Sequence, residues 1–419
     1  MQLSPVIQRR LLWLGAAIAV AAYFPRFRHG SGSEVFSAAA DCMLHGQTPR
    51  HCGDLIYAYP PFFALLWTPL APLPQLGREI VWYLVILGTI FAALKLSEAL
   101  VRRTFAGDWS ERELVTFRAV TFVLGLKLML SVLSNQAYDS LGATFIFAGL
   151  LALISGRSLL GGASLAVAAA LKLTPVIFLP YLLFKGRFAA AGVFTVVLVF
   201  LALLPDVLLP SPGQWHIVVW IRDIVLAPMT VKPGFDLPFW ITDTPLNQSF
   251  YTAMVRLFTG VHEQQPFDVV FAITQSTAFK IALNSVMGVY IIIVGCVMLK
   301  SRRHDGLIAV DGALLVISAI LLSPVSSQSH FIGLLLPYAL IAAAAVRDPS
   351  KRVFHSAMLI ATFVLTTATS NDLVGRSFSG WAVWNSFPMY GALVLVIPLA
   401  VLIWWPGAAR KPGQEAVAR

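Results

Sequence analysis

The chain has 419 residues, of which 58% are hydrophobic and only 12% are charged, and its formal net charge is +10 at pH 7. Soluble domains carry about 25% charged residues, so this composition excludes an ordinary soluble protein and indicates an integral membrane protein. The positive charges lie beside apolar segments, a placement typical of membrane topology, so they give no support for nucleic-acid binding.

Apolar runs that suit membrane-spanning helices recur along the whole chain. A helix of about 20 residues crosses a hydrocarbon core of about 30 Å and satisfies its own backbone polar groups there. The sequence therefore predicts an all-α polytopic bundle of about 12 spans. One integral membrane domain is expected over residues 1–409, with a cytoplasmic tail at 410–419. The expected spans are 7–25, 62–101, 115–133, 138–155, 158–171, 173–184, 188–209, 280–299, 307–323, 330–346, 353–369 and 384–405.

Basic residues gather at every second boundary between these spans. Positive clusters mark the cytoplasmic side of a membrane protein, so both termini are expected in the cytoplasm. The first span should remain uncleaved, because Tyr23-Phe24-Pro25-Arg26 is not a small-residue cleavage site. The basic residues are Arg9, Arg10, Arg102, Arg103, Arg112, Arg118, Arg157, Lys185, Arg187, Lys300, Arg302, Arg303, Arg347, Lys351, Arg352, Arg410 and Lys411.

With this topology, two long polar segments, 26–61 and 210–279, face the periplasm or the exterior of a bacterial cell membrane. The first segment collects titratable residues in an otherwise apolar chain, among them Glu34, Asp41 and three histidines. It also contains Cys42 and Cys52, which could form a disulfide on an oxidising face or remain two thiols. Function is therefore expected on the extracytoplasmic side.

A break is predicted between the short apolar runs 158–171 and 173–184, where Lys172-Leu173-Thr174-Pro175 interrupts the pattern. Proline removes a helical hydrogen-bond donor, so two short helices should meet here. A lysine in the membrane is costly unless it meets an anion. Alternatively, the side chain of Lys172 extends so that its ammonium reaches the outer membrane interface.

Common catalytic motifs are absent from the sequence. It has no HExxH, P-loop, GxGxxG or CxxC pattern, and no Asp-x-Asp pair to clamp a metal–diphosphate complex. The sequence therefore predicts neither a metal ion nor a cofactor.

Several short motifs follow one another in a fixed order along the chain. They are Ala38-Ala39-Ala40, Leu44-His45-Gly46, Tyr59-Pro60-Pro61, Pro69-Leu70-Ala71-Pro72-Leu73-Pro74, Asn135-Gln136, Leu171-Lys172-Leu173-Thr174-Pro175, Asn247-Gln248-Ser249 and Ser323-Pro324-Val325-Ser326. This order resembles that of the GT87 glycosyltransferases, membrane enzymes of the GT-C type that use polyprenyl-phosphate mannose. Two departures stand out: Gly32 and Ser33 replace an Asp usual before the pair Val35-Phe36, and Ser329-His330 replaces a His pair.

The resemblance implies transfer of a sugar, typically mannose, from a polyprenyl-phosphate donor to a lipid or glycan acceptor outside the cytoplasm. An inverting transfer needs a base for the acceptor hydroxyl and cations near the departing phosphate. Glu34 is the predicted base, with Asp41 in reserve on the same helical face. The predicted phosphate ligands are Lys172, Arg256, His330 and Arg376. The residues expected to line the sugar or acceptor site are Tyr57, Tyr59, Asn135, Gln136, Asn247 and Gln248.

Two other classes of function remain open from the sequence. About 12 spans with broken helices would also suit a secondary transporter. A non-catalytic partner in envelope glycan assembly is the other alternative, favoured if Glu34 proves dispensable. Sugar transfer by the purified protein, or flux into proteoliposomes, would separate these functions.

Overall fold

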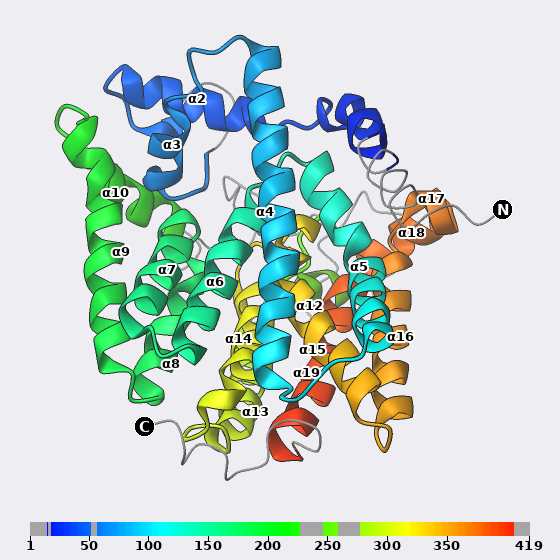
Figure 1. Cartoon of the computed structure of the whole chain (residues 1–419). Coiled ribbons are helices and arrows are strands. Elements are labelled where there is room, and N and C mark those ends of the chain that lie inside the picture. Colours follow the sequence, from blue (N-terminus) through cyan, green and yellow to red (C-terminus); the bar gives the residue numbers. More distant parts are fainter. Residues whose placement is uncertain (1–14, 16–17, 52–56, 227–245, 259–276, 406–419) are drawn as a thin grey trace.

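A computed structural model describes residues 15, 18–51, 57–226, 246–258 and 277–405, which are helical with no β-strand among them (Figure 1). The first described helix covers Ile18–Phe27. The helices that follow are α2 (Gly32–Leu44), α3 (Pro61–Trp67), α4 (Gln75–Thr104), α5 (Glu111–Ser134), α6 (Asp139–Ile154), α7 (Ser158–Leu171), α8 (Phe178–Phe184), α9 (Phe188–Leu208), α10 (His216–Trp220), α12 (Phe250–Phe258), α13 (Thr277–Leu299), α14 (Ile308–Leu322), α15 (Leu335–Arg347), α16 (Arg352–Thr367), α17 (Asn371–Val374), α18 (Arg376–Trp384) and α19 (Phe387–Trp404). Shorter helical turns are η1 (Pro49–His51), η2 (Thr174–Ile177), η3 (Ile221–Val225), η4 (Asp305–Leu307) and η5 (Gln328–Leu334).

Seven helices within the described ranges are long and apolar enough to cross a membrane. Five shorter apolar helices accompany them: Ile18–Phe27, Asp139–Ile154, Ser158–Leu171, Thr174–Phe184 and Arg352–Thr367. The prediction of an all-α, polytopic membrane fold is therefore confirmed for the described part of the chain. The number of crossings and the side of each terminus stay predictions.

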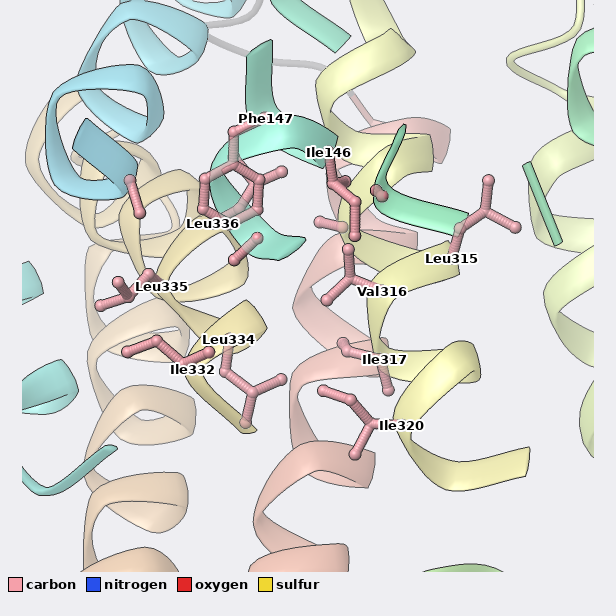
Figure 2. Packing of buried hydrophobic residues seen from close by; sticks show 14 of the residues in the cluster. Ile146, Phe147, Leu315, Val316, Ile317, Ile320, Ile332, Leu334, Leu335 and Leu336 are labelled. Atoms are coloured by element: carbon pink, nitrogen blue, oxygen red, sulfur yellow. The ribbon is translucent and has the colours of Figure 1, made fainter. Parts of the chain in front are cut away.

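The centre of the bundle is formed by α14 and by η5 with α15. The buried share of their apolar windows is 78% and 89%, against 22% for α9, so α9 belongs to the lipid-facing surface. Figure 2 shows Ile146 and Phe147 of α6 among side chains of α14, such as Val316, and of η5 and α15, such as Leu334 and Leu335. Because α6 and η5 both pack against this core, the residues at their ends have fixed positions relative to one another.

Small residues allow the helices beside this core to approach closely. A Cβ atom on Gly162 of α7 would lie 2.2 Å from the carbonyl oxygen of Ala190 in α9, which is closer than any side chain tolerates. Packing of membrane helices depends on such backbone approach, because lipid provides no hydrophobic driving force between helices. Helix α7 is thereby fixed between α6 and α9.

The predicted break at Lys172 is confirmed. Helix α7 ends at Leu171, Lys172 has an extended backbone, and the chain turns back through η2 into α8. The hydroxyl of Tyr138, just before α6, donates to the carbonyl oxygen of Leu171 at 3.1 Å. This hydrogen bond joins the start of α6 to the end of α7, which is where the charged residues of the site lie.

Part of the segment treated as a polar loop, 26–61, is a 13-residue helix, α2. Its buried residues include Phe36, Ala40 and Met43, which share one face of a helix, so burial of that face explains why the segment is helical. The ring of Phe36 packs against those of Trp67 and Tyr138. Helix α2 therefore lies over α3 and the start of α6, at the upper end of the bundle in Figure 1.

The opposite end of the bundle carries the basic connections (Figure 1). There Lys185 donates to the carbonyl oxygen of Ser301 at 2.7 Å, and Arg187 pairs with Asp305 at 2.5 Å. Helix α4, which carries Arg102 and Arg103 in its last turn, contacts η4 at this end. The assignment of this end to the cytoplasmic side stays a prediction, because Arg28 and Arg78 lie at the end that carries α2 and the start of α4.

Candidate functional site

A cavity of about 60 Å³ lies where α6, the α7–α8 turn, α14 and η5 meet. Its polar lining includes Asp139, Lys172, Thr174, Ser326 and His330. Apolar residues, most of them from α6, α14 and η5, close the remaining walls. A volume of this size holds a few water molecules, so a hexosyl phosphate would have to enter partly through its open side.

The carboxylate of Asp139 is the centre of this polar group. Its Oδ1 lies 2.7 Å from Lys172 Nζ and 3.7 Å from His330 Nε2. The side chains of all three residues are at most one-fifth exposed. Buried charges are stable when they are paired, so Asp139 compensates the charge of Lys172, and it compensates His330 whenever that ring is protonated.

The two nitrogens of His330 differ in their contacts. Its Nδ1 is buried and makes no hydrogen bond of good geometry, although the backbone of Val325 lies beside the ring. A buried polar atom without a good partner costs free energy, and a bound water, a bound ion or a catalytic role is a common reason for one in a native protein. The imidazole thus has one nitrogen near Asp139 and one available for a ligand.

Aromatic side chains lead from α2 and α3 to this cavity. The ring of Tyr59 lies 5.0 Å from that of Tyr138 and 5.7 Å from that of Phe36, measured between centroids. Burial raises the pKa of the Tyr59 phenol, and the nearby Asp139 carboxylate raises it further. Tyr59 therefore stays protonated and can donate a hydrogen bond.

The predicted bases Glu34 and Asp41 both lie on α2 and are exposed. Phe36 faces Tyr138 and Tyr59, and Glu34 stands about 200° around the helix from Phe36 at 100° per residue. The structure therefore places Glu34 on the far side of α2 from the cavity wall and does not bring it together with Lys172. Its role as base stays a prediction.

The Asn135-Gln136 motif holds α2 onto the bundle. Gln136 is fully buried, with its Oε1 accepting from the backbone N–H of Ser33 at 2.8 Å and its Nε2 donating to Phe27 O at 2.9 Å. Its φ of 50° is in the left-handed region. Asn135 is exposed and donates to Ser131 O in its own helix.

The Asn247-Gln248 motif is hydrogen-bonded to the turn that precedes η5. Asn247 donates to Pro324 O at 2.8 Å, and its Oδ1 accepts from the backbone N–H of Ser326 at 2.9 Å. The backbone N–H of Gln248 donates to Ser326 O at 2.7 Å. Since Ser326 lines the cavity and His330 follows four residues later, these hydrogen bonds position one wall of the site.

The surroundings of three other predicted site residues, Tyr57, Arg256 and Arg376, differ from the polar cavity at which Lys172 lies. Tyr57 is buried, with its hydroxyl donating to Pro60 O. Arg256 is fully buried and donates to Asn247 O, Trp384 O and Ser386 Oγ at 2.6–2.9 Å. Arg376 begins α18 and is exposed. Of the four predicted phosphate ligands, the structure brings only Lys172 and His330 together around this cavity.

Arg256→Met should lower thermal stability rather than weaken donor binding. The change removes the donors to two backbone carbonyls and a hydroxyl, and each buried acceptor left without a partner costs about 1–3 kcal/mol. Thermal unfolding in detergent would measure the loss, with the exposed Arg376→Met as the matched control. A higher KM for the donor with unchanged unfolding would instead support a phosphate-binding role.

Cys42 is disulfide-bonded, and Cys296 is a free thiol. Cys52 lies outside the described residues, so its pairing with Cys42 stays a prediction. Among the described residues, no group of three or more His, Cys, Asp or Glu side chains could hold a metal ion.

Asp139 was not among the predicted site residues, although it is the residue that joins Lys172 and His330. Its signal in the sequence is a carboxylate three residues after Asn135-Gln136, at the start of an apolar run. An acidic residue beside the membrane with no nearby basic residue in the sequence indicates a partner from another helix. That partner, Lys172, lies 33 residues further along the chain.

The fold and the buried charged cluster define a multi-pass membrane protein with a polar site at one end of its helices. The chain belongs to glycosyltransferase family 87, whose model matches residues 57–324. It is 27% identical over 370 residues to a polyprenol-phosphate-mannose-dependent α-(1-2)-phosphatidylinositol pentamannoside mannosyltransferase of Mycobacterium tuberculosis (strain CDC 1551 / Oshkosh). That alignment covers 87% of this chain and 76% of the relative. The resemblance to this family is confirmed, and the protein is a glycosyltransferase.

The matched region contains Asp139 and Lys172, whereas Glu34 precedes it and His330 follows it.

Proposed function

We propose that the protein transfers a mannosyl group from a polyprenyl-phosphate donor to a lipid or glycan acceptor at the extracytoplasmic face. The transfer inverts the anomeric centre and uses no metal ion. The observation that carries this proposal is the buried cluster of Asp139, Lys172 and His330 at the cavity. It supplies a carboxylate and two nitrogen donors, the groups that transfer from a sugar phosphate requires.

The extracytoplasmic assignment is supported by the two ends of the bundle. The basic connections that include Lys185, Arg187 and Arg302 lie at the end away from α2 and α3 (Figure 1). Positive residues favour the cytoplasm. Asp139 begins α6 and Lys172 follows α7, so both belong to the end that carries α2.

Lys172 and His330 are the proposed ligands of the donor phosphate. When a phosphate enters the cavity, the ammonium of Lys172 can exchange Asp139 for a phosphate oxygen without losing a charged partner. The buried Nδ1 of His330 is the second donor when it carries the proton. Both groups stabilise the negative charge that grows on the phosphate as the sugar leaves.

Asp139 is the proposed base. Once Lys172 has turned to the phosphate, the Asp139 carboxylate can accept the proton of the acceptor hydroxyl. The acceptor oxygen then forms a bond to the anomeric carbon while the bond to the phosphate oxygen breaks. Polyprenyl phosphate leaves with the electron pair. Glu34, with Asp41 in reserve, is the alternative base that the sequence favours.

The name of the mycobacterial relative supports mannose as the sugar and a mannosylated phospholipid as the acceptor class. We extend both to this chain as part of the proposal. A glycan carried on a lipid would let donor and acceptor approach the cavity from the same membrane leaflet.

The test is an assay of the purified full-length protein with radiolabelled polyprenyl-phosphate mannose and a lipid extract. Transfer of label to an extracted lipid is expected in detergent without added metal and in the presence of a chelator. The linkage analysis should show an inverted anomeric centre. No product with any extract, or label taken up into proteoliposomes without transfer, would overturn the proposal.

A further inference from the structure

A second cation lies within the membrane-spanning part of the bundle, on α5. Lys127 is partly buried and donates to the carbonyl oxygen of Thr366 at 2.8 Å and to the hydroxyl of Thr369. Within the described chain it has no acidic partner. A charged side chain in a membrane span is costly and pairs with another charge or a backbone carbonyl, or faces a functional cavity. Thr366 O and the Thr369 hydroxyl accept hydrogen bonds from Lys127 but leave its positive charge without an anion.

A small cavity of about 10 Å³ adjoins this lysine, enough for about one water molecule or one oxygen of a larger group. Ser131 and Gln328 contribute further polar groups to its lining. The hydroxyls of Thr366 and Thr369 already donate to Thr362 O and Thr366 O. The cavity therefore offers an ammonium, an amide and the Ser131 hydroxyl to a single acceptor oxygen.

The position of the cavity favours a ligand from the membrane. Lys127 precedes the end of α5 at Ser134 by seven residues, about 10 Å along the helix. Its neighbours Phe122, Val123 and Leu126 are large, apolar and exposed, as expected of a lipid-facing surface. An anion that reaches Lys127 across this surface would be attached to a lipid.

The segment η5 is the wall shared by the two cavities. Gln328 and Phe331 line the cavity beside Lys127, while His330 lines the cavity beside Asp139. The two sites are thus neighbours on opposite faces of one short helix, but their cationic groups come from different elements, α5 and the α7–α8 turn.

We propose that the cavity beside Lys127 binds the phosphate group of an anionic membrane lipid. The ammonium of Lys127 pairs with the phosphate, while one phosphate oxygen enters the cavity between Ser131 and Gln328. Charge-assisted hydrogen bonds of this kind are stronger than those between neutral groups. The bound lipid supplies the negative charge that the described residues do not place beside Lys127.

Native mass spectrometry of the full-length protein would test this site with phosphatidylglycerol and phosphatidylcholine as probes. The wild type should retain one phosphatidylglycerol with about a tenfold preference, which corresponds to about 1.4 kcal/mol. Lys127→Gln should abolish the preference, and Lys127→Arg should keep most of it. The matched control is Lys95→Gln, because Lys95 is an exposed lysine of the spanning helix α4.

An equal preference in the wild type and Lys127→Gln would overturn the proposal, as would a loss in Lys95→Gln of the same size.

A second measurement needs no variant, in case Lys127→Gln does not fold. Acylation of the Lys127 amine by an amine reagent should be slower in nanodiscs with phosphatidylglycerol than in phosphatidylcholine alone. Equal rates would show that Lys127 only donates hydrogen bonds at the C-terminal end of α16. Equal protection by inorganic phosphate would rule out a lipid as the specific ligand.

Discussion

Asp139→Asn is expected to reduce mannosyl transfer by about 10²–10⁴-fold, the contribution of a well-placed general base. Asparagine keeps the shape of the side chain and can still accept a hydrogen bond from Lys172, but it cannot take the acceptor proton. The loss should fall on kcat, with little change in the KM for either substrate. Initial rates with the radiolabelled donor would measure both parameters.

Glu34→Gln is the companion experiment, because the sequence favours Glu34 as base. With Asp139 as base, Glu34→Gln should retain transfer, since Glu34 is exposed on the far side of α2 from the cavity wall. If Glu34→Gln abolishes transfer while Asp139→Asn remains active, the base is Glu34. Thermal unfolding of both variants would show that the comparison concerns folded protein.

Lys172→Met is expected to lower kcat/KM for the donor by about 10²–10³-fold, similar to the loss of one group that stabilises developing negative charge. Methionine matches the length of lysine and removes its charge. Lys172→Arg should recover part of the activity. Lys95→Met removes an exposed lysine from another apolar helix and should have no effect.

A structural effect of Lys172→Met can be separated from a catalytic one. The change leaves Asp139 buried without its closest cation, which is destabilising. The double variant Asp139→Asn with Lys172→Met removes both charges and should regain thermal stability while remaining inactive. If transfer returned together with stability, both Asp139 and Lys172 would have only structural roles.

The helical architecture could be predicted because it depends on local patterns. Runs of apolar residues define the spans, and Pro175 after Lys172 defines the break between α7 and α8. Lys172 could be identified as a candidate for the same reason, since a lysine between two apolar runs is conspicuous without knowledge of its neighbours.

The composition of the site depends on contacts between distant segments, and these could not be predicted. Asp139 meets Lys172 across 33 residues of chain. Arg256 resembles a phosphate ligand in the sequence, but two of its donors are bonded to Trp384 O and Ser386 Oγ, about 130 residues away. Asn247 is a polar motif residue whose contacts with Pro324 and Ser326 position the wall before His330.

The short length of α7 has a consequence for how the lipid-linked donor reaches the site. Its 14 residues extend about 21 Å, whereas the hydrocarbon core is about 30 Å thick. If α7 begins at the cytoplasmic surface, the turn at Lys172 lies deeper than the ends of full-length spans, where Asp139 keeps its ammonium paired. A polyprenyl chain could then stay among the acyl chains while its phosphate moves sideways into the protein. The substrate would not have to leave the membrane at any stage of the reaction.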